Sequence, residues 1–169
     1  CREKLTYDEV DIILEDPSNH LYSVLSGLYR VAEDHLVERF EKGAVALEHS
    51  ERRVRVTPQR GIRVSMRPRQ SRADLLVSEL MVMANVACAK FCCDREIPIF
   101  YRVQQSPDLT NFENNEHELV YRYRMLSCMQ RAQMTLEPGI HSGLGVSPYC
   151  QASSPLRRYA DLVVQRQIL

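Results

Sequence analysis

Apolar residues at three- and four-residue intervals predict helices in the first quarter of the chain. The longest run predicts a helix from His20 to Lys42, and Gly43 stands where a helix C-cap is expected. Its apolar positions are Leu21, Val24, Leu25, Leu28, Val31, Ala32 and Leu36. Upstream, Thr6 and Glu9 have the spacing of a capping box, in which each side chain bonds the other residue's backbone. A shorter helix is therefore expected to about residue 15, and Pro17 ends it.

The pattern then changes to clustered or alternating β-branched residues, which are typical of strands. Short strands are expected at Ala44–Leu47, Arg53–Thr57 and Ile62–Met66, with a turn at Pro58–Gly61 between the last two. Together these segments predict a small β-meander that follows the helices.

Helical spacing returns after Ser71, which with Asp74 predicts the start of a long helix that continues to about Cys93. Its expected core face consists of Leu75, Leu76, Leu80, Met83, Ala84, Ala87 and Phe91. Further expected elements are a strand at Ile97–Val103, a helix at Glu118–Gln133 and a last helix from Ser154. The mixture lacks regular strand–helix–strand alternation, so the expected fold class is α+β, with helices packed on a small antiparallel sheet.

Composition excludes several classes of protein. Hydrophobic residues make up 44% of the chain and charged residues 26%, ordinary values for a soluble globular protein. No uninterrupted run of 18 apolar residues occurs and no secretory segment is recognised, so neither a membrane partner nor secretion is expected. Six cysteines lack any CxxC or Cys/His ligand spacing, which favours buried, reduced thiols over a zinc site. His141 likewise has no partner at ligand spacing and is read as a loop residue.

A net charge of zero conceals an uneven charge distribution. Residues 51–72 contain eight arginines and a single acid, Glu51, whereas the first forty residues are acid-rich. The arginine-rich stretch could form a groove wall that attracts phosphates without reading sequence. Equally, it could be a solvated hairpin whose arginines cover apolar surface and pair with the acidic helices.

The most informative local feature is SSPLRRYADLVVQRQIL, at Ser153–Leu169. Ser154 is a good N-cap and Pro155 suits the first helical position, which would place Arg157 and Arg158 in the first turn. Two guanidinium groups beside free backbone amides would together bind a phosphate. The alternative is that both arginines are solvated, or that Arg157 pairs with Asp161 four residues later.

This segment resembles the terminal signature of the ribonuclease II/R catalytic (RNB) domain, T-S-P-I-R-R-Y-x-D-L-x-x-H-R. Five further stretches resemble motifs of the same family, in the same order and at roughly the same spacing. They are KLTYDEV at Lys4–Val10, GAVALE at Gly43–Glu48, LLVSELMVMANVACA at Leu75–Ala89, IPIFYRVQ at Ile97–Gln104 and EPGIHSGLGVSPYCQASSPLRRYAD at Glu137–Asp161. The resemblance covers the whole chain, which is therefore expected to be the C-terminal part of a single such domain, truncated at both ends.

The resemblance implies a 3′→5′ exoribonuclease that hydrolyses single-stranded RNA to nucleoside 5′-monophosphates. Family members use metal ions, usually Mg²⁺, held by clustered aspartates in the N-terminal half of the domain. No such cluster occurs in this sequence, so the metal ligands are expected upstream of it and the fragment alone is expected to be inactive. Flanking OB-fold RNA-binding domains are expected in the full-length protein. The expected compartment is the bacterial cytoplasm or an organelle.

The resemblance also assigns roles to residues of the last motif. Arg157 matches the family position thought to contact the scissile phosphate and is the candidate catalytic residue. Arg158 is expected to contact a backbone phosphate or to act as a packing cation. Ser154 and Tyr159 belong to the same candidate RNA-binding segment.

Four candidate RNA-binding residues lie earlier in the chain. Tyr7 matches a tyrosine that holds the terminal nucleotide, although it could simply pack at a helix start. Leu47 stands where the family has a base-stacking aromatic residue, and stacking is worth about 1–3 kcal/mol per base. Ser78 and Glu79 stand at a paired Glu-Glu position near the terminal ribose. The changes at Leu47 and Ser78, with Ser153 and Gln165 at usual threonine and histidine positions, leave open a diverged, non-catalytic RNA-binding protein. A structural helical module without any nucleic-acid role is a third alternative.

Overall fold

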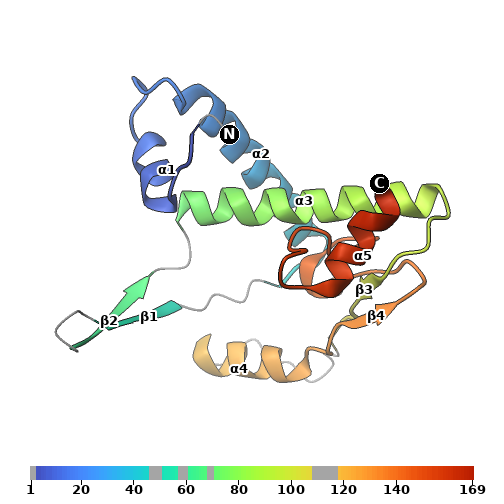
Figure 1. Cartoon of the computed structure of the whole chain (residues 1–169). Helices are drawn as coiled ribbons and strands as arrows, with labels where there is room; N and C mark the ends of the chain where they lie inside the picture. The colour runs from blue at the N-terminus through green and yellow to red at the C-terminus, as the bar shows by residue number, and fades with distance from the viewer. Residues whose placement is uncertain (1–2, 46–50, 57–60, 68–70, 108–117) are drawn as a thin grey trace. The chain divides into compact units, whose positions relative to one another are not determined.

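The computed structural model describes residues 3–45, 51–56, 61–67, 71–107 and 118–169 (Figure 1). The elements in chain order are α1 (Tyr7–Ile13), α2 (Tyr22–Glu41), β1 (Glu51–Val56), β2 (Ile62–Arg67), α3 (Arg72–Asp94), β3 (Tyr101–Val103), α4 (Glu118–Cys128), β4 (Gln133–Thr135), the 3₁₀ helix η1 (Ser142–Leu144) and α5 (Tyr159–Ile168). Two compact units divide the chain: residues 1–34 with 47–79, and residues 35–46 with 80–169. The expected α+β class is confirmed, with small antiparallel sheets beside a helix-rich remainder.

Helix starts in the first unit follow the predicted capping chemistry. The Thr6 backbone N–H donates to Glu9 Oε2 at 2.6 Å, and the Glu9 N–H donates to Thr6 Oγ1 at 3.3 Å, which completes the capping box of α1. Ser71 caps α3 by accepting from the Asp74 N–H at 3.1 Å. Asp11 joins these helices, because its Oδ1 accepts from the Ala73 N–H at 2.9 Å. The end of the first helix was predicted less accurately, because α1 stops at Ile13 rather than near residue 15.

The predicted hairpin is present in the first unit. Strands β1 and β2 pair antiparallel, with Glu51 opposite Arg67 and Val56 opposite Ile62. The strand expected at Ala44–Leu47 is not confirmed: Ala44 and Val45 are not in a strand, and Leu47 lies outside the described residues.

The C-terminus of α2, in the second unit, ends as expected at Gly43. This residue has φ +87°, a left-handed conformation that glycine adopts at little cost. Its N–H donates to Phe40 O at 3.0 Å and the Ala44 N–H donates to Arg39 O at 2.9 Å, the two bonds of a Schellman motif. Arg39 also donates from Nη1 to Leu144 O at 3.1 Å, which ties α2 to the last residue of η1.

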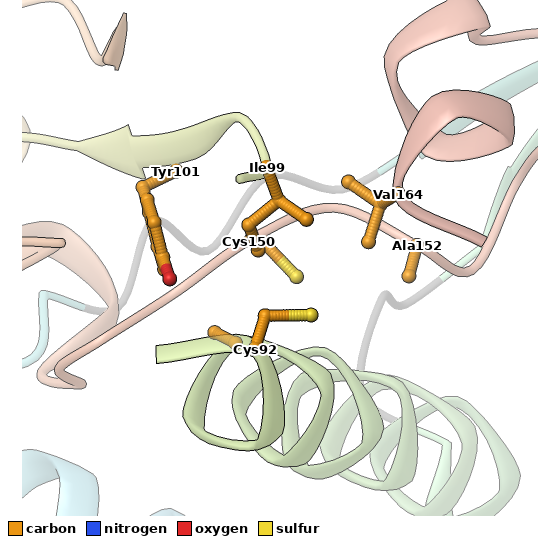
Figure 2. Packing of buried hydrophobic residues seen from close by; sticks show 7 residues of the cluster. Cys92, Ile99, Tyr101, Cys150, Ala152 and Val164 are labelled. Carbon is orange, nitrogen blue, oxygen red and sulfur yellow. The ribbon is translucent and has the colours of Figure 1, made fainter. Parts of the chain in front are cut away.

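The core of the second unit lies between α3, α5 and the segments around Ile99 and Cys150 (Figure 2). Its buried members are Ala89, Cys92, Ile99, Tyr101, Cys150, Ala152 and Val164. Burial raises the pKa of Cys150 to about 12, so this thiol stays protonated and unreactive at neutral pH. The five described cysteines are all free thiols.

The buried face of α3 differs from the predicted one. Ala84, Ala87 and Phe91 are exposed, whereas Asn85 and Cys92 are buried. Apolar periodicity could not reveal this rotation, because the buried stripe includes a polar residue whose partners lie about 65 positions later in the chain. By length and composition alone α3 could cross a membrane, with a mean hydropathy of 1.6 over its most apolar window. The sequence expectation considered only uninterrupted apolar runs. Core helices of soluble proteins meet the same criterion, so this is weak evidence for a span.

The remaining segments are shorter than predicted. Only Tyr101–Val103 of the expected strand Ile97–Val103 is a strand, and α4 ends at Cys128 rather than at Gln133. Gln133 instead begins β4, which pairs antiparallel with β3. A strand of three residues is too short to produce an alternating pattern, so its pairing was invisible in the sequence.

Candidate functional site

The segment before α5 does not begin the helix where the sequence predicted. Ser154 was expected to be the N-cap, but α5 starts at Tyr159 and its N-cap is Arg158, in an extended conformation with φ −129° and ψ 115°. Residues 154–157 form a separate turn, in which Ser154 O accepts from the N–H groups of Arg157 at 3.3 Å and Arg158 at 3.1 Å. Both arginines therefore precede the helix instead of lying in its first turn.

The carboxylate of Asp161 accounts for this arrangement. It lies at the third position of α5 and is fully buried, and its Oδ2 accepts from the Ser154 N–H at 2.8 Å. The same oxygen accepts from Arg158 Nη2 at 2.8 Å. A buried carboxylate requires such partners, so it holds the turn and the Arg158 side chain against the helix start. Asp161 thus pairs with Arg158, and the pairing of Arg157 with Asp161 considered from the sequence does not occur.

The side chain of Arg157, unlike that of Arg158, is not bound within the described part of the protein. This side chain is exposed, and among the described residues it has no hydrogen-bond or ion-pair partner. Its neighbours Leu156 and Tyr159 are also exposed, the tyrosine to 75%. Arginine and aromatic side chains are the two types that bind phosphates and stack on bases when proteins bind single-stranded RNA, which makes this segment a candidate site.

Two side chains fix the segment that leads to this turn. Gln165, at the usual histidine position, donates from Nε2 to Ala152 O at 2.6 Å. Asn85 on α3 bonds the same segment, because its Oδ1 accepts from the Ala152 N–H at 2.9 Å. Sequence reasoning missed this connection to the arginines.

The earlier candidate residues belong to the first unit, whereas Arg157 belongs to the second. Tyr7 begins α1 and is 40% exposed. Ser78 is exposed, and its hydroxyl donates to Leu75 O at 3.0 Å. Glu79 is buried, with 2% exposure. Leu47 lies outside the described residues.

Comparison with known proteins supplies the family. The model of the RNB domain matches residues 1–169, the whole chain. The chain belongs to the RNB domain family. The resemblance inferred from the sequence motifs is confirmed by this match.

Named relatives of this RNB chain are ribonucleases. It is 28% identical to a ribonuclease of Synechocystis sp., over 98% of this chain and 25% of that protein. It is 31% identical to the chloroplastic/mitochondrial ribonuclease II of Arabidopsis thaliana, over 77% of this chain and 17% of that protein. The chain thus spans a quarter or less of the length of these curated relatives.

Solved structures share the RNB fold. The Dss1 exoribonuclease of Candida glabrata has a TM-score of 0.80 and 26% identity, over 98% of this chain and 24% of that one. Ribonuclease R of Mycoplasma genitalium, in complex with ribose-methylated single-stranded RNA, has a TM-score of 0.79 and 20% identity, over 96% of this chain and 31% of that one. Yeast Ssd1, a pseudonuclease, has a TM-score of 0.61 and 17% identity, over 97% of this chain and 25% of that one. The last two likenesses concern the fold alone.

In the described part of this RNB chain, no group of three or more His, Cys, Asp or Glu side chains could hold a metal ion. His141 lies outside the helices and strands, as expected, at the N-cap of η1; it is buried, and its ring packs edge-on to Tyr149 with 5.3 Å between centroids. Burial, aided by the charge of Arg102, lowers the pKa of His141 to about 4, so the imidazole is neutral at pH 7.

Proposed function

We propose that the full-length protein is a 3′→5′ exoribonuclease that hydrolyses single-stranded RNA to nucleoside 5′-monophosphates with the help of Mg²⁺. Family membership supports the reaction class, and the exposed Arg157 beside an anchored Arg158 is the observation that carries the site. In this proposal the chain supplies the arginine side of the active centre. The Mg²⁺ ligands would come from residues outside this chain, since the described residues do not form such a site.

Arg157 would act as an electrostatic catalyst. Its guanidinium can donate two parallel hydrogen bonds to phosphate oxygens, and these bonds strengthen as negative charge builds up during attack on the phosphorus. The Asp161 carboxylate binds the Arg158 side chain and the Ser154 N–H, which lie on either side of Arg157. The backbone that carries Arg157 is therefore already ordered. Such pre-organised donors contribute most in the transition state, so Arg157 should matter more for rate than for RNA affinity.

Contacts to the RNA end complete the proposal. Tyr7 would hold the terminal nucleotide, and Tyr159 would offer a ring for a base. The Ser78 hydroxyl donates its proton to Leu75 O, so its lone pairs remain to accept a hydrogen bond from a ribose 2′-hydroxyl. Glu79 would orient that region from its buried position. Leu47 would give only an apolar contact, which predicts a weak hold on the terminal bases.

The test uses full-length protein, Mg²⁺ and a 5′-labelled RNA with a single-stranded 3′ tail. Stepwise shortening with release of nucleoside 5′-monophosphates is expected. Arg157→Ala should lower the single-turnover rate by about 100- to 1000-fold and RNA affinity by less than about tenfold. The matched control is Arg131→Ala, which removes an exposed arginine from the same unit and should change neither quantity. Equal losses of rate and affinity in Arg157→Ala would indicate a simple binding contact.

A second candidate function is RNA binding without hydrolysis. It is favoured by Leu47 and Ser78 at positions where the family has an aromatic residue and an acid, and the pseudonuclease Ssd1 shows that the fold occurs without nuclease activity. This function predicts RNA binding that persists in EDTA, with no shortening in Mg²⁺. Absence of single-stranded RNA binding even at low salt would instead favour a structural helical module.

A further inference from the structure

Asn85 is a buried polar residue in the middle of α3, with 3% of its surface exposed. Its amide donates from Nδ2 to the Tyr149 hydroxyl at 3.2 Å and to Ser153 Oγ at 3.4 Å. Its Oδ1 accepts from the Ala152 N–H at 2.9 Å. Even its backbone carbonyl takes part, since it accepts from Cys150 Sγ at 3.4 Å. All these partners lie in residues 149–153, so one residue of α3 binds one short segment at both ends and in the middle.

That segment leads directly into the turn that carries Arg157. Ser153 Oγ, which accepts from Asn85, also accepts from Arg158 Nη2 at 3.5 Å. Arg158 in turn binds Asp161, whose carboxylate holds the Ser154 N–H. A continuous series of hydrogen bonds therefore runs from α3 to both ends of the turn.

We propose that Asn85 is a positioning residue for Arg157. The inference rests on the proposed exoribonuclease function, and it concerns geometry rather than contact with RNA. Asn85 holds residues 149–153 at one position along α3, and Gln165 of α5 binds the same segment through Ala152 O. The turn is thereby held between two helices, and the exposed guanidinium starts from an ordered backbone. A shift of about 1 Å in a catalytic group can cost about 100-fold in rate, so loss of Asn85 should be visible in turnover.

Gln104 provides a matched control within the same unit. It too is a buried amide, with 9% exposure, and it uses both ends of its side chain: Nε2 donates to Gln130 O at 2.7 Å and Oε1 accepts from the Gly143 N–H at 3.1 Å. Its partners are not in residues 149–158. A purely structural role of buried amides would make Asn85→Ala and Gln104→Ala equivalent.

The experiment measures single-turnover rate, RNA affinity and melting temperature in the full-length protein. Variants are Asn85→Ala, Gln104→Ala and Arg157→Ala, and the double variant of Asn85 with Arg157. Asn85→Ala should lower the rate by about 10- to 100-fold with affinity changed less than about threefold. In the Arg157→Ala background the same substitution should cost less than about twofold, because the group it positions is gone. Gln104→Ala should lower the melting temperature yet leave the rate within about twofold of wild type below that temperature.

Several outcomes would overturn the inference. An equal rate loss from Asn85→Ala with and without Arg157 would show that Asn85 acts by another route. A rate loss from Gln104→Ala as large as that from Asn85→Ala would assign both to general stability. If Asn85→Ala does not fold, Tyr149→Phe decides, because it removes one hydroxyl partner of Asn85 and keeps the ring: its rate loss must also vanish without Arg157. Wild-type protein that leaves RNA intact would remove the proposed function itself, a result distinct from active protein insensitive to Asn85.

Discussion

Arg158 and Asp161 form an ion pair with 2.8 Å between Nη2 and Oδ2, and the carboxylate is fully buried. The side chain of Arg157, the preceding residue, has no hydrogen-bond or ion-pair partner among the described residues. Two adjacent arginines therefore do different work: one satisfies a buried charge within the protein, and the other remains available to an external anion.

Removal of Arg158 should destabilise the protein far more than removal of Arg157. Arg158→Ala leaves the buried Asp161 carboxylate with only the Ser154 N–H, and breaking a buried pair costs about 3–5 kcal/mol of the free energy of unfolding. A value near 3 kcal/mol is expected because the Arg158 side chain is 32% exposed. Arg157→Ala should change the same quantity by less than about 0.5 kcal/mol. Urea denaturation measures both, and similar losses in the two variants would contradict the assignment.

Two glycines should respond to alanine in opposite directions. At Gly145, with φ +65°, an added Cβ would clash with the Arg39 backbone oxygen, so both the conformation and the contact are unfavourable. Gly145→Ala should lower the free energy of unfolding by about 2 kcal/mol or more. Gly27 lies inside α2 with nothing within 4 Å of an added Cβ, and Gly27→Ala should stabilise by about 0.5–1 kcal/mol. Thermal unfolding of the two variants tests the pair; stabilisation by Gly145→Ala would mean that the loop adopts another backbone.

Local sequence signals predicted the fold where the determining contacts are local. The capping box at Thr6 and Glu9 and the C-cap at Gly43 each depend on residues within five positions, and the structure confirms them. The predicted start of α5 was wrong, because the helix start depends on hydrogen bonds that the Asp161 carboxylate accepts from the earlier residues Ser154 and Arg158. Ser154 followed by Pro155 has the form of a helix start, and only the burial of Asp161 shows otherwise.

The family motifs predicted the family, which is confirmed, and they gave Arg157 and Arg158 different roles, which stay predictions. They left open whether Arg158 contacts a phosphate or packs within the protein, because burial is a tertiary property. Asn85 was missed for the same reason, since its partners lie 64 to 68 positions away. Its place in the apolar stripe of α3 was the available signal: a buried amide implies hydrogen-bond partners elsewhere in the chain.

Stability should fall as pH decreases from 6.5 to 4 because of His141. The folded protein holds this pKa at about 4, below the ordinary value of 6.5, so in that window the unfolded chain binds a proton that the folded chain does not. At pH 4 and below, the accumulated loss of unfolding free energy is about 3 kcal/mol, and above pH 6.5 this loss disappears. His141→Gln should flatten this part of the pH profile of unfolding free energy. Wild-type stability that is constant or rises on acidification through this window would contradict the buried, neutral imidazole.

Restoring an aromatic residue at position 47 should strengthen the hold on RNA ends. The sequence has Leu47 where the family has a base-stacking residue, and stacking contributes about 1–3 kcal/mol per base. Leu47→Phe in the full-length protein should therefore tighten binding of short 3′ ends by about fivefold or more. Equilibrium binding to RNAs of decreasing length measures the effect. The conservative control Leu47→Met should leave affinity unchanged, and unchanged affinity in Leu47→Phe would show that this position does not face the terminal bases.

The salt dependence of RNA binding decides between the two interpretations of the arginine-rich hairpin. The register of β1 and β2 pairs Arg55 with Arg63, so one double substitution removes two neighbouring arginines of the hairpin. Each phosphate contact contributes about 0.7 to the slope of log affinity against log salt for single strands, so Arg55→Gln with Arg63→Gln should reduce the slope by about 1.4 if this hairpin contacts RNA. If these arginines do not contact RNA, the double variant keeps the wild-type slope.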